Sequence, residues 1–167
     1  MAGRRAAAKS PTPPARHAIR YAEEVVIILM GAAGAGKTTI GRALAAELGW
    51  TFVDGDDHHP AVDTLHTIVA RALDRREPAV IACSALRRRH REILRGDRHP
   101  VRFVYLQTGE PELRRRLAGR SDPVAGPSLL QSQLAALEAP SADEALTVDA
   151  SWPPERILGA IRAEFGV

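Results

Sequence analysis

Short apolar runs alternate with longer stretches of helical periodicity along most of this chain. Residues 25–30 read Val-Val-Ile-Ile-Leu-Met, an uninterrupted apolar run of the kind that is buried on both faces of a parallel sheet. Shorter runs of the same character recur between polar and glycine- or proline-containing stretches. We predict five strands, at residues 25–30, 51–54, 79–84, 101–106 and 146–148.

The segments between these strands have apolar side chains three or four residues apart, as one buried face of a helix requires. Ile40, Leu44 and Leu48 show this spacing after the first strand. We predict helices at about residues 37–48, 62–75, 87–95, 111–119, 128–138 and 153–165. Strands that alternate with helices indicate an α/β fold of three layers, a five-stranded parallel sheet with helices on both faces.

A glycine-rich loop joins the first predicted strand to the first predicted helix. It contains the complete pattern G-x-x-x-x-G-K-[ST] of a phosphate-binding loop. In this order of strand, loop and helix, backbone N–H groups and the positive end of the helix dipole face phosphate oxygens. We therefore predict a P-loop NTPase fold that binds the phosphates of ATP through Gly31, Ala32, Ala33, Gly34, Ala35, Gly36, Lys37, Thr38 and Thr39.

Lys37 is one of two lysines in a chain that has 21 arginines, which suggests chemistry that arginine cannot replace. A compact ammonium group can enter a narrow nest of backbone N–H groups and bridge two phosphates, whereas a planar guanidinium is too wide. We predict that Lys37 is catalytic. The hydroxyl of Thr38, the next residue, is predicted to bind Mg²⁺.

The positive charge of this 167-residue chain is concentrated at its amino end. Residues 1–21 hold five basic and no acidic residues, so the net charge of the remainder is 3 − 5 = −2. We predict a disordered basic tail over residues 1–22 and a P-loop kinase domain over residues 23–167. An organelle transit peptide has a similar composition and is the less favoured interpretation of the tail.

Composition also indicates the cellular compartment and argues against some classes of partner. No apolar run is long enough to span a membrane, and the single cysteine, Cys83, excludes an internal disulfide, so we expect a cytoplasmic protein without a membrane partner. The basic run at residues 87–91 would spread around a helix without interleaved aromatic residues. We therefore expect no nucleic-acid partner.

Ligands of open α/β sheets bind beyond the carboxyl ends of the strands, and the second predicted strand ends in acidic residues. Asp54 and Asp56 occupy alternate positions and so share one face of the chain. A hard cation needs a carboxylate, and a nucleophilic hydroxyl benefits from a general base. We assign Asp54 to Mg²⁺, and Asp56 to catalysis and to the acceptor substrate. An acidic turn that only ends the strand is the alternative.

Arginines follow the fourth predicted strand. Arg116 and Arg120 are four residues apart, on one face of a helix, and a segment that contains proline and glycine follows at residues 121–127. Arginines that lead into such a segment suit a lid that neutralises the transferring phosphoryl group. We predict that Arg116 binds the nucleotide and that Arg120 is catalytic; a solvated basic face is the alternative, with more weight for Arg114 and Arg115 than for Arg120.

Taken together, the motifs resemble the gluconate kinase (gluconokinase) family, within the shikimate kinase-like P-loop kinases. The resemblance covers nearly everything from Val26 onward. It is carried by the phosphate loop and by Asp54-Gly55-Asp56 with His59-Pro60, Cys83-Ser84-Ala85-Leu86 with Arg91, Arg116-Leu117 with Arg120, and Ser132-Gln133 with Leu137-Glu138.

This resemblance implies Mg²⁺- and ATP-dependent phosphorylation of D-gluconate to 6-phospho-D-gluconate, usually by a homodimer. It also implies that Asp56 and His59 border the sugar acid and that Arg120 acts from a lid. We assign Arg91, from the basic run, to the substrate as well.

Two stretches depart from the family pattern. The long polar segment that the family carries after its His-Pro pair is missing after Pro60, and Pro-Val-Ala-Gly at residues 123–126 replaces the Gly-His-Phe of the family's lid. Two alternatives to a gluconokinase therefore stay open. The first is a kinase of a different small hydroxylated acceptor, and the second is an ATP-binding regulatory protein with a degenerate acceptor site.

Overall fold

A single parallel sheet of five strands organises the protein. The computed structural model describes residues 25–55, 62–97, 100–119 and 127–167, and the predicted tail lies outside these ranges. The strands are hydrogen-bonded in the order β2-β3-β1-β4-β5. Their bounds are β1 (Val26–Met30), β2 (Thr51–Asp54), β3 (Ala79–Ala82), β4 (Val101–Gln107) and β5 (Leu146–Asp149).

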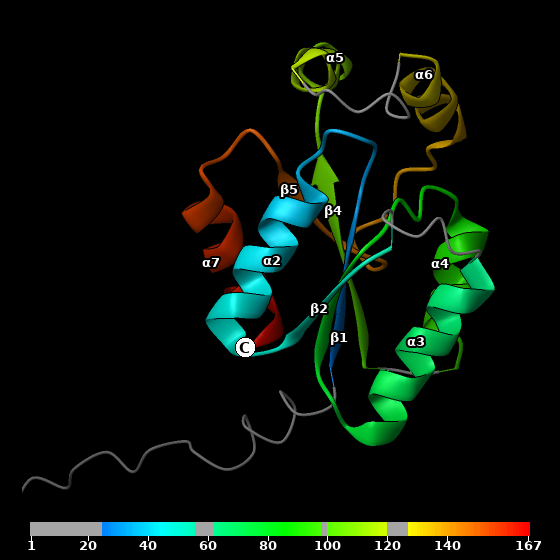
Figure 1. Ribbon diagram of the computed structural model, residues 1–167, viewed down its shortest axis with the longest axis vertical. Helices are drawn as coiled ribbons and strands as arrows, with labels where there is room; N and C mark the ends of the chain where they lie inside the picture. Colours follow the sequence, from blue (N-terminus) through cyan, green and yellow to red (C-terminus); the bar gives the residue numbers. More distant parts are fainter. Residues whose placement is uncertain (1–24, 56–61, 98–99, 120–126) are drawn as a thin grey trace, which may run out of the picture.

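Helices cover both faces of the sheet and the ends of its strands. The described helices are α2 (Lys37–Leu48), α3 (Val62–Arg75), α4 (Arg88–Arg95), α5 (Glu110–Ala118), α6 (Pro127–Ala136) and α7 (Pro154–Phe165). Figure 1 shows α2 and α7 on one side of the sheet and α3 and α4 on the other, with α5 and α6 beyond the carboxyl end of β4. The predicted three-layer α/β fold is confirmed.

The central strand β1 explains why two helical layers are needed. All five of its residues have no exposed surface. Ile27 and Leu29 pack in the apolar cluster that includes α2 and α7, and Val26, Ile28 and Met30 pack in the cluster that includes α3 and α4. Because successive side chains of a strand point to opposite faces, an uninterrupted apolar run requires cover on both of them.

Two strands are shorter than the sequence predicts, β1 by one residue at its start and β3 by two residues at its end. β3 ends at Ala82 and not at Ser84, because its neighbour β2 ends where Asp54 pairs with Ala82. Cys83 still donates its N–H to Leu29, and its buried thiol is in no disulfide. Ser84 also accepts the N–H of Gly31 at 3.3 Å, so the chain stays hydrogen-bonded beside β1 for two residues after β3.

None of the helices in the described ranges combines the length and the apolar character needed to cross a membrane. The longest of them, α3, has 14 residues. Spanning a bilayer takes about 20 predominantly apolar residues.

Candidate active site

The phosphate loop lies at the carboxyl end of β1, where the strand gives way to α2. Gly34 and Gly36 have φ angles of 87° and 98°, in the left-handed region that other residues rarely adopt. Gly36 is also the N-cap of α2 and has no side chain with which to cap the helix. The first N–H groups of a helix have no intrahelical acceptor, so this end of α2 is suited to bind phosphate oxygens.

Lys37 is the first residue of α2 and lies inside the loop. Its side chain is 5% exposed, and Nζ lies 3.4 Å from the carbonyl oxygen of Ala32. The ammonium group is therefore folded back over the loop that precedes it. A positive charge in this position faces the site where the phosphates of a nucleotide would bind.

Thr38 and Asp54 meet at the other side of the loop. The Thr38 hydroxyl donates a hydrogen bond of 2.7 Å to Asp54 Oδ2, so the two residues predicted to bind Mg²⁺ lie together. The next residue, Gly55, donates its N–H to Ala82 over 2.7 Å, and a Cβ at this position would lie 2.8 Å from the same oxygen. Only glycine allows this close approach, which fixes the end of β2 beside the loop.

This pair has the chemistry of a magnesium site. Mg²⁺ prefers oxygen ligands and is usually held by one or two carboxylates, with phosphate oxygens and water completing its shell. A hydroxyl that donates its proton to Asp54 keeps lone pairs for a cation. In the described ranges no group of three His, Cys, Asp or Glu side chains could hold a metal by itself.

Arg116, on α5, lies between the phosphate loop and the residue that follows β5. Its guanidinium donates to the carbonyls of Gly34 and Ala35 at 3.4 Å, and to Ala150 at 2.9 Å. Nε donates to Glu112 at 2.6 Å. Arg116, the predicted nucleotide-binding arginine, is thus held in place by the loop carbonyls, by Ala150 and by Glu112.

Glu112 keeps this arginine in place over a wide pH range. Hydrogen bonds from Arg115 and Arg116 lower the pKa of the Glu112 carboxyl to about 2. Because the lowered pKa is far below neutrality, Glu112 stays charged and paired at neutral pH. Arg115 itself is exposed, which fits the alternative of a solvated basic face at that position.

A residue of α6 that had no assigned role also reaches the loop. Gln133 Oε1 accepts the backbone N–H of Ala33 over 2.6 Å. The sequence pattern in and just after α6 could have pointed to Gln133. It is a polar residue on the apolar face formed by Leu130, Leu134 and Leu137. A polar side chain on a buried face usually has a specific partner.

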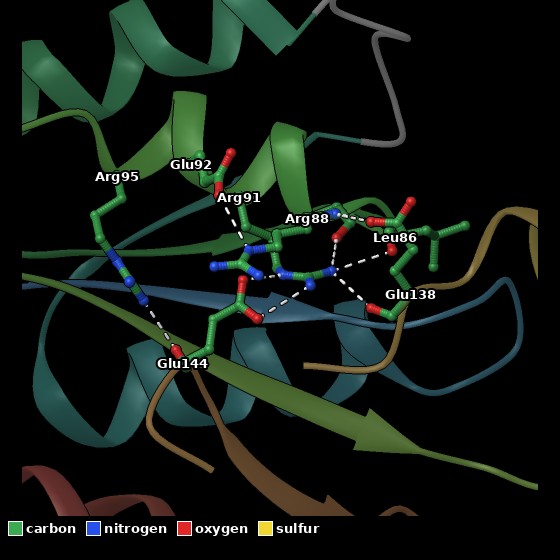
Figure 2. A network of polar contacts seen from close by, with 8 residues as sticks. Leu86, Arg88, Arg91, Glu92, Arg95, Glu138 and Glu144 are labelled. Carbon is green, nitrogen blue, oxygen red and sulfur yellow. Dashed lines mark hydrogen bonds and ion pairs between the residues drawn. The ribbon is translucent and has the colours of Figure 1, made fainter. Parts of the chain in front are cut away.

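Arg91 forms a network within the protein (Figure 2). Its side chain is 2% exposed and pairs with both carboxylate oxygens of Glu144, at 2.7 and 3.1 Å. Nη1 donates to the carbonyls of Ala85, Leu86 and Glu138 at 3.0 to 3.2 Å. Direct contact between Arg91 and a substrate stays a prediction, and these protein partners favour a structural role.

Glu138 links this network to α6. It donates its N–H to Leu86 at 2.9 Å, and its carboxylate accepts the N–H of Arg88 at 2.7 Å. With the bond from Arg91, three hydrogen bonds fix the chain just after α6 to the start of α4. Exposed neighbours of Arg91, such as Arg88 and Arg89, confirm that the basic run spreads around the helix.

Three predicted site residues lie outside the described ranges. They are Asp56 and His59, which follow β2, and Arg120, which follows α5. Their roles toward the acceptor and the transferring phosphoryl group therefore stay predictions. The described part of the site is its nucleotide half.

Sequence comparison identifies the relatives of this chain. The family model for shikimate kinase matches residues 33–68. A gluconokinase of Gluconobacter oxydans is 35% identical over 160 residues, which take in 83% of this chain and 90% of the relative. The aligned region spans 160 positions, more than 83% of a 167-residue chain, so it includes positions at which this chain has no residue.

Solved structures give the same result. The crystal structure of a gluconokinase from Sinorhizobium meliloti superposes with a TM-score of 0.70 at 30% identity and covers 86% of this chain and 93% of its own. A sugar kinase from a Janibacter species superposes with a TM-score of 0.75 at 30% identity and covers 83% of this chain and 92% of its own.

Proposed function

Because the chain belongs to the gluconokinase family, we propose that it transfers the terminal phosphoryl group of ATP to D-gluconate, which gives ADP and 6-phospho-D-gluconate. The observation that carries the proposal is the complete nucleotide half of the site. Lys37 is buried in the phosphate loop, and Thr38 and Asp54 are joined by a hydrogen bond beside it.

In the proposed reaction, a hydroxyl oxygen of gluconate bonds to the γ-phosphorus as the bond to the β,γ-bridging oxygen breaks. The hydroxyl proton passes to Asp56, and the electron pair of the broken bond leaves on ADP. Lys37 and the N–H groups at the start of α2 stabilise the negative charge of the phosphates, and Arg116 holds the loop. Arg120 acts on the transferring group, and His59 borders the sugar acid.

Mg²⁺ bound by Thr38 and Asp54 would neutralise phosphate charge. Asp54→Asn should therefore raise the Mg²⁺ concentration needed for half-maximal activity by about tenfold or more, because the hydroxyl of Thr38 loses its anionic partner. A Mg²⁺ titration of ADP release measures this shift. Asp97→Asn, an exposed substitution in the turn after α4, is the matched control. An unchanged Mg²⁺ requirement in Asp54→Asn would remove Asp54 from the metal site.

Asp56→Asn separates the acceptor side from the nucleotide side. We expect kcat to fall by about a hundredfold or more, because an amide cannot take the hydroxyl proton, while the Kd for ATP stays within about twofold of the wild-type value. Steady-state kinetics and calorimetric titration with ATP measure the two quantities. The exposed Asp63→Asn substitution in the first turn of α3 provides a control for loss of an acidic group. Normal turnover by Asp56→Asn would show that Asp56 is not the base.

The substrate is tested by ADP release from Mg·ATP with D-gluconate, other sugar acids, polyols and shikimate. We expect strong stimulation by D-gluconate. Stimulation only by another compound would show that the protein is a kinase of a different acceptor. Such a result would agree with the residues that this chain lacks relative to its family. Tight ATP binding without stimulation by any of these compounds would favour a regulatory protein.

The proposal also covers the cellular location and the oligomeric state of the protein. We expect the enzyme to act in the cytoplasm, as the composition indicates, and as a homodimer, as the family resemblance implies. Gel filtration with light scattering on the full chain measures the assembly state.

A further inference from the structure

The contact between Gln133 and the phosphate loop joins segments 100 residues apart in the sequence. Gln133 Oε1 lies 2.6 Å from the backbone nitrogen of Ala33. An N–H group needs an acceptor, so the carbonyl end of the carboxamide must face Ala33. The nitrogen Nε2 is bonded to the same carbon and therefore also lies beside the loop, where it has two N–H groups to donate.

The helix that carries Gln133 is fixed to the protein at several points. Leu130 has no exposed surface, and Leu134 packs against the same apolar cluster as the loop residues Ala32 and Ala35. Beyond the helix, Glu138 is held by its three hydrogen bonds to Leu86, Arg88 and Arg91. Side chains on packed elements keep their geometry better than those on loops, so Gln133 is preorganised at the loop.

The loop is held from two directions. Arg116 binds the carbonyls of Gly34 and Ala35 from α5, and Gln133 binds the N–H of Ala33 from α6. Arginine brings a positive charge, whereas the carboxamide is neutral and offers both a donor and an acceptor. Gln133 can therefore hold the loop with its oxygen and still donate to an anion with its nitrogen.

Resting on the proposed function, we propose that Gln133 is a further nucleotide-binding residue: its oxygen fixes Ala33, and its nitrogen donates to the terminal phosphate of ATP. ADP lacks this phosphate. Gln133 therefore acts on the affinity for ATP and on phosphoryl transfer, and has little effect on the affinity for ADP.

Gln133→Glu tests the proposal directly. The carboxylate keeps an acceptor for Ala33, so a purely structural role survives, but it replaces the donor by a negative charge. We expect the affinity for ATP to fall by about tenfold or more relative to that for ADP, because like charges at close range repel. Calorimetric titration of the purified chain with Mg·ATP and Mg·ADP, without any acceptor, measures this ratio.

Gln131→Glu is the matched control, since it makes the same change at an exposed position of the same helix. We expect its ratio of ATP to ADP affinity to stay within about twofold of the wild-type value, because water and salt screen an exposed charge. An unchanged ratio in Gln133→Glu, or an equal change in both variants, would overturn the proposal. A wild-type chain that binds neither nucleotide would overturn it together with the proposed function.

Gln133→Leu removes the acceptor and the donor without adding charge. We expect kcat to fall by about tenfold with the KM for the acceptor unchanged, because the terminal phosphate loses one donor in the transition state. Thermal unfolding checks that the variant is folded. Wild-type kcat in folded Gln133→Leu would overturn the role in transfer even if ATP bound normally. If Gln133→Glu shows its affinity change while no acceptor is phosphorylated, the Gln133 proposal stands and the acceptor assignment fails.

Discussion

Lys37→Ala should lower kcat for ADP formation by about a thousandfold or more while leaving the protein folded. Lys37 is 5% exposed and its ammonium group lies over the phosphate loop, whereas the nearby Arg116 guanidinium is engaged with Glu112 and with the loop carbonyls. Methyl groups in place of the side chain cannot stabilise the charge that develops on the transferring phosphoryl group. Steady-state kinetics measure the loss, and circular dichroism checks the fold.

Lys37→Arg is the matched comparison because it keeps the charge. We expect it to be nearly as inactive as Lys37→Ala, since a planar guanidinium does not match a nest of backbone N–H groups that suits a compact ammonium. Near-normal turnover by Lys37→Arg would show that charge alone suffices. Turnover by Lys37→Ala within about tenfold of the wild-type rate would contradict the catalytic role.

Arg91→Leu should have the largest effect on stability. We expect it to lower the free energy of unfolding by about 3 kcal/mol or more, because breaking a buried ion pair leaves the remaining charge without compensation. The substitution would leave the Glu144 carboxylate and the carbonyl oxygens of Ala85 and Glu138 without the Arg91 donor, in a place where Arg91 is 2% exposed and Glu144 is 14% exposed. Equilibrium unfolding in urea measures the change.

Arg88→Leu is the control from the same helix. Its ion pair with Glu92 is exposed, with 73% of the Arg88 side chain in solvent, so we expect a loss below about 1 kcal/mol. The double variant Arg91→Leu, Glu144→Leu should be more stable than Arg91→Leu alone, because it removes the uncompensated carboxylate. A loss in Arg91→Leu as small as that in Arg88→Leu would show that the network contributes little.

Acid should weaken the same network. Hydrogen bonds and charge from Arg91 lower the pKa of Glu144, so the folded protein binds the proton less tightly than the unfolded chain does. The stability from this pair is therefore fully present above the unfolded pKa of about 4.5 and is lost as the pH falls through the lower folded value. Arg91→Leu should show a weaker dependence of unfolding free energy on pH in that acid range.

The local sequence was sufficient to predict the elements and the phosphate loop. The run at residues 25–30 became a strand buried on both faces, and the pattern from Gly31 to Thr38 became a loop that ends at the start of α2. Both depend on neighbouring residues only. Alternation of apolar positions sets the period of an element, and glycines permit positive φ angles whatever the rest of the fold does.

Pairings between distant segments were harder to predict. The juxtaposition of Thr38 and Asp54 could be expected, because both follow strands of one parallel sheet and ligands bind at the carboxyl ends of such strands. Strand order could not be read from any one segment. Placing β1 between β3 and β4 depends on how all the helices pack on the two faces.

Three features were decided by the tertiary structure alone. Within the basic run at residues 87–91, the sequence does not show that Arg91 is the arginine that turns inward to Glu144. Nor does it show that Gln133 meets Ala33, or that Arg116 meets the carbonyls of the loop. Hydrogen bonds of this kind depend on the positions of whole elements, which the packing of the apolar core sets, whereas the sequence by itself determined the elements and the chemistry of the loop.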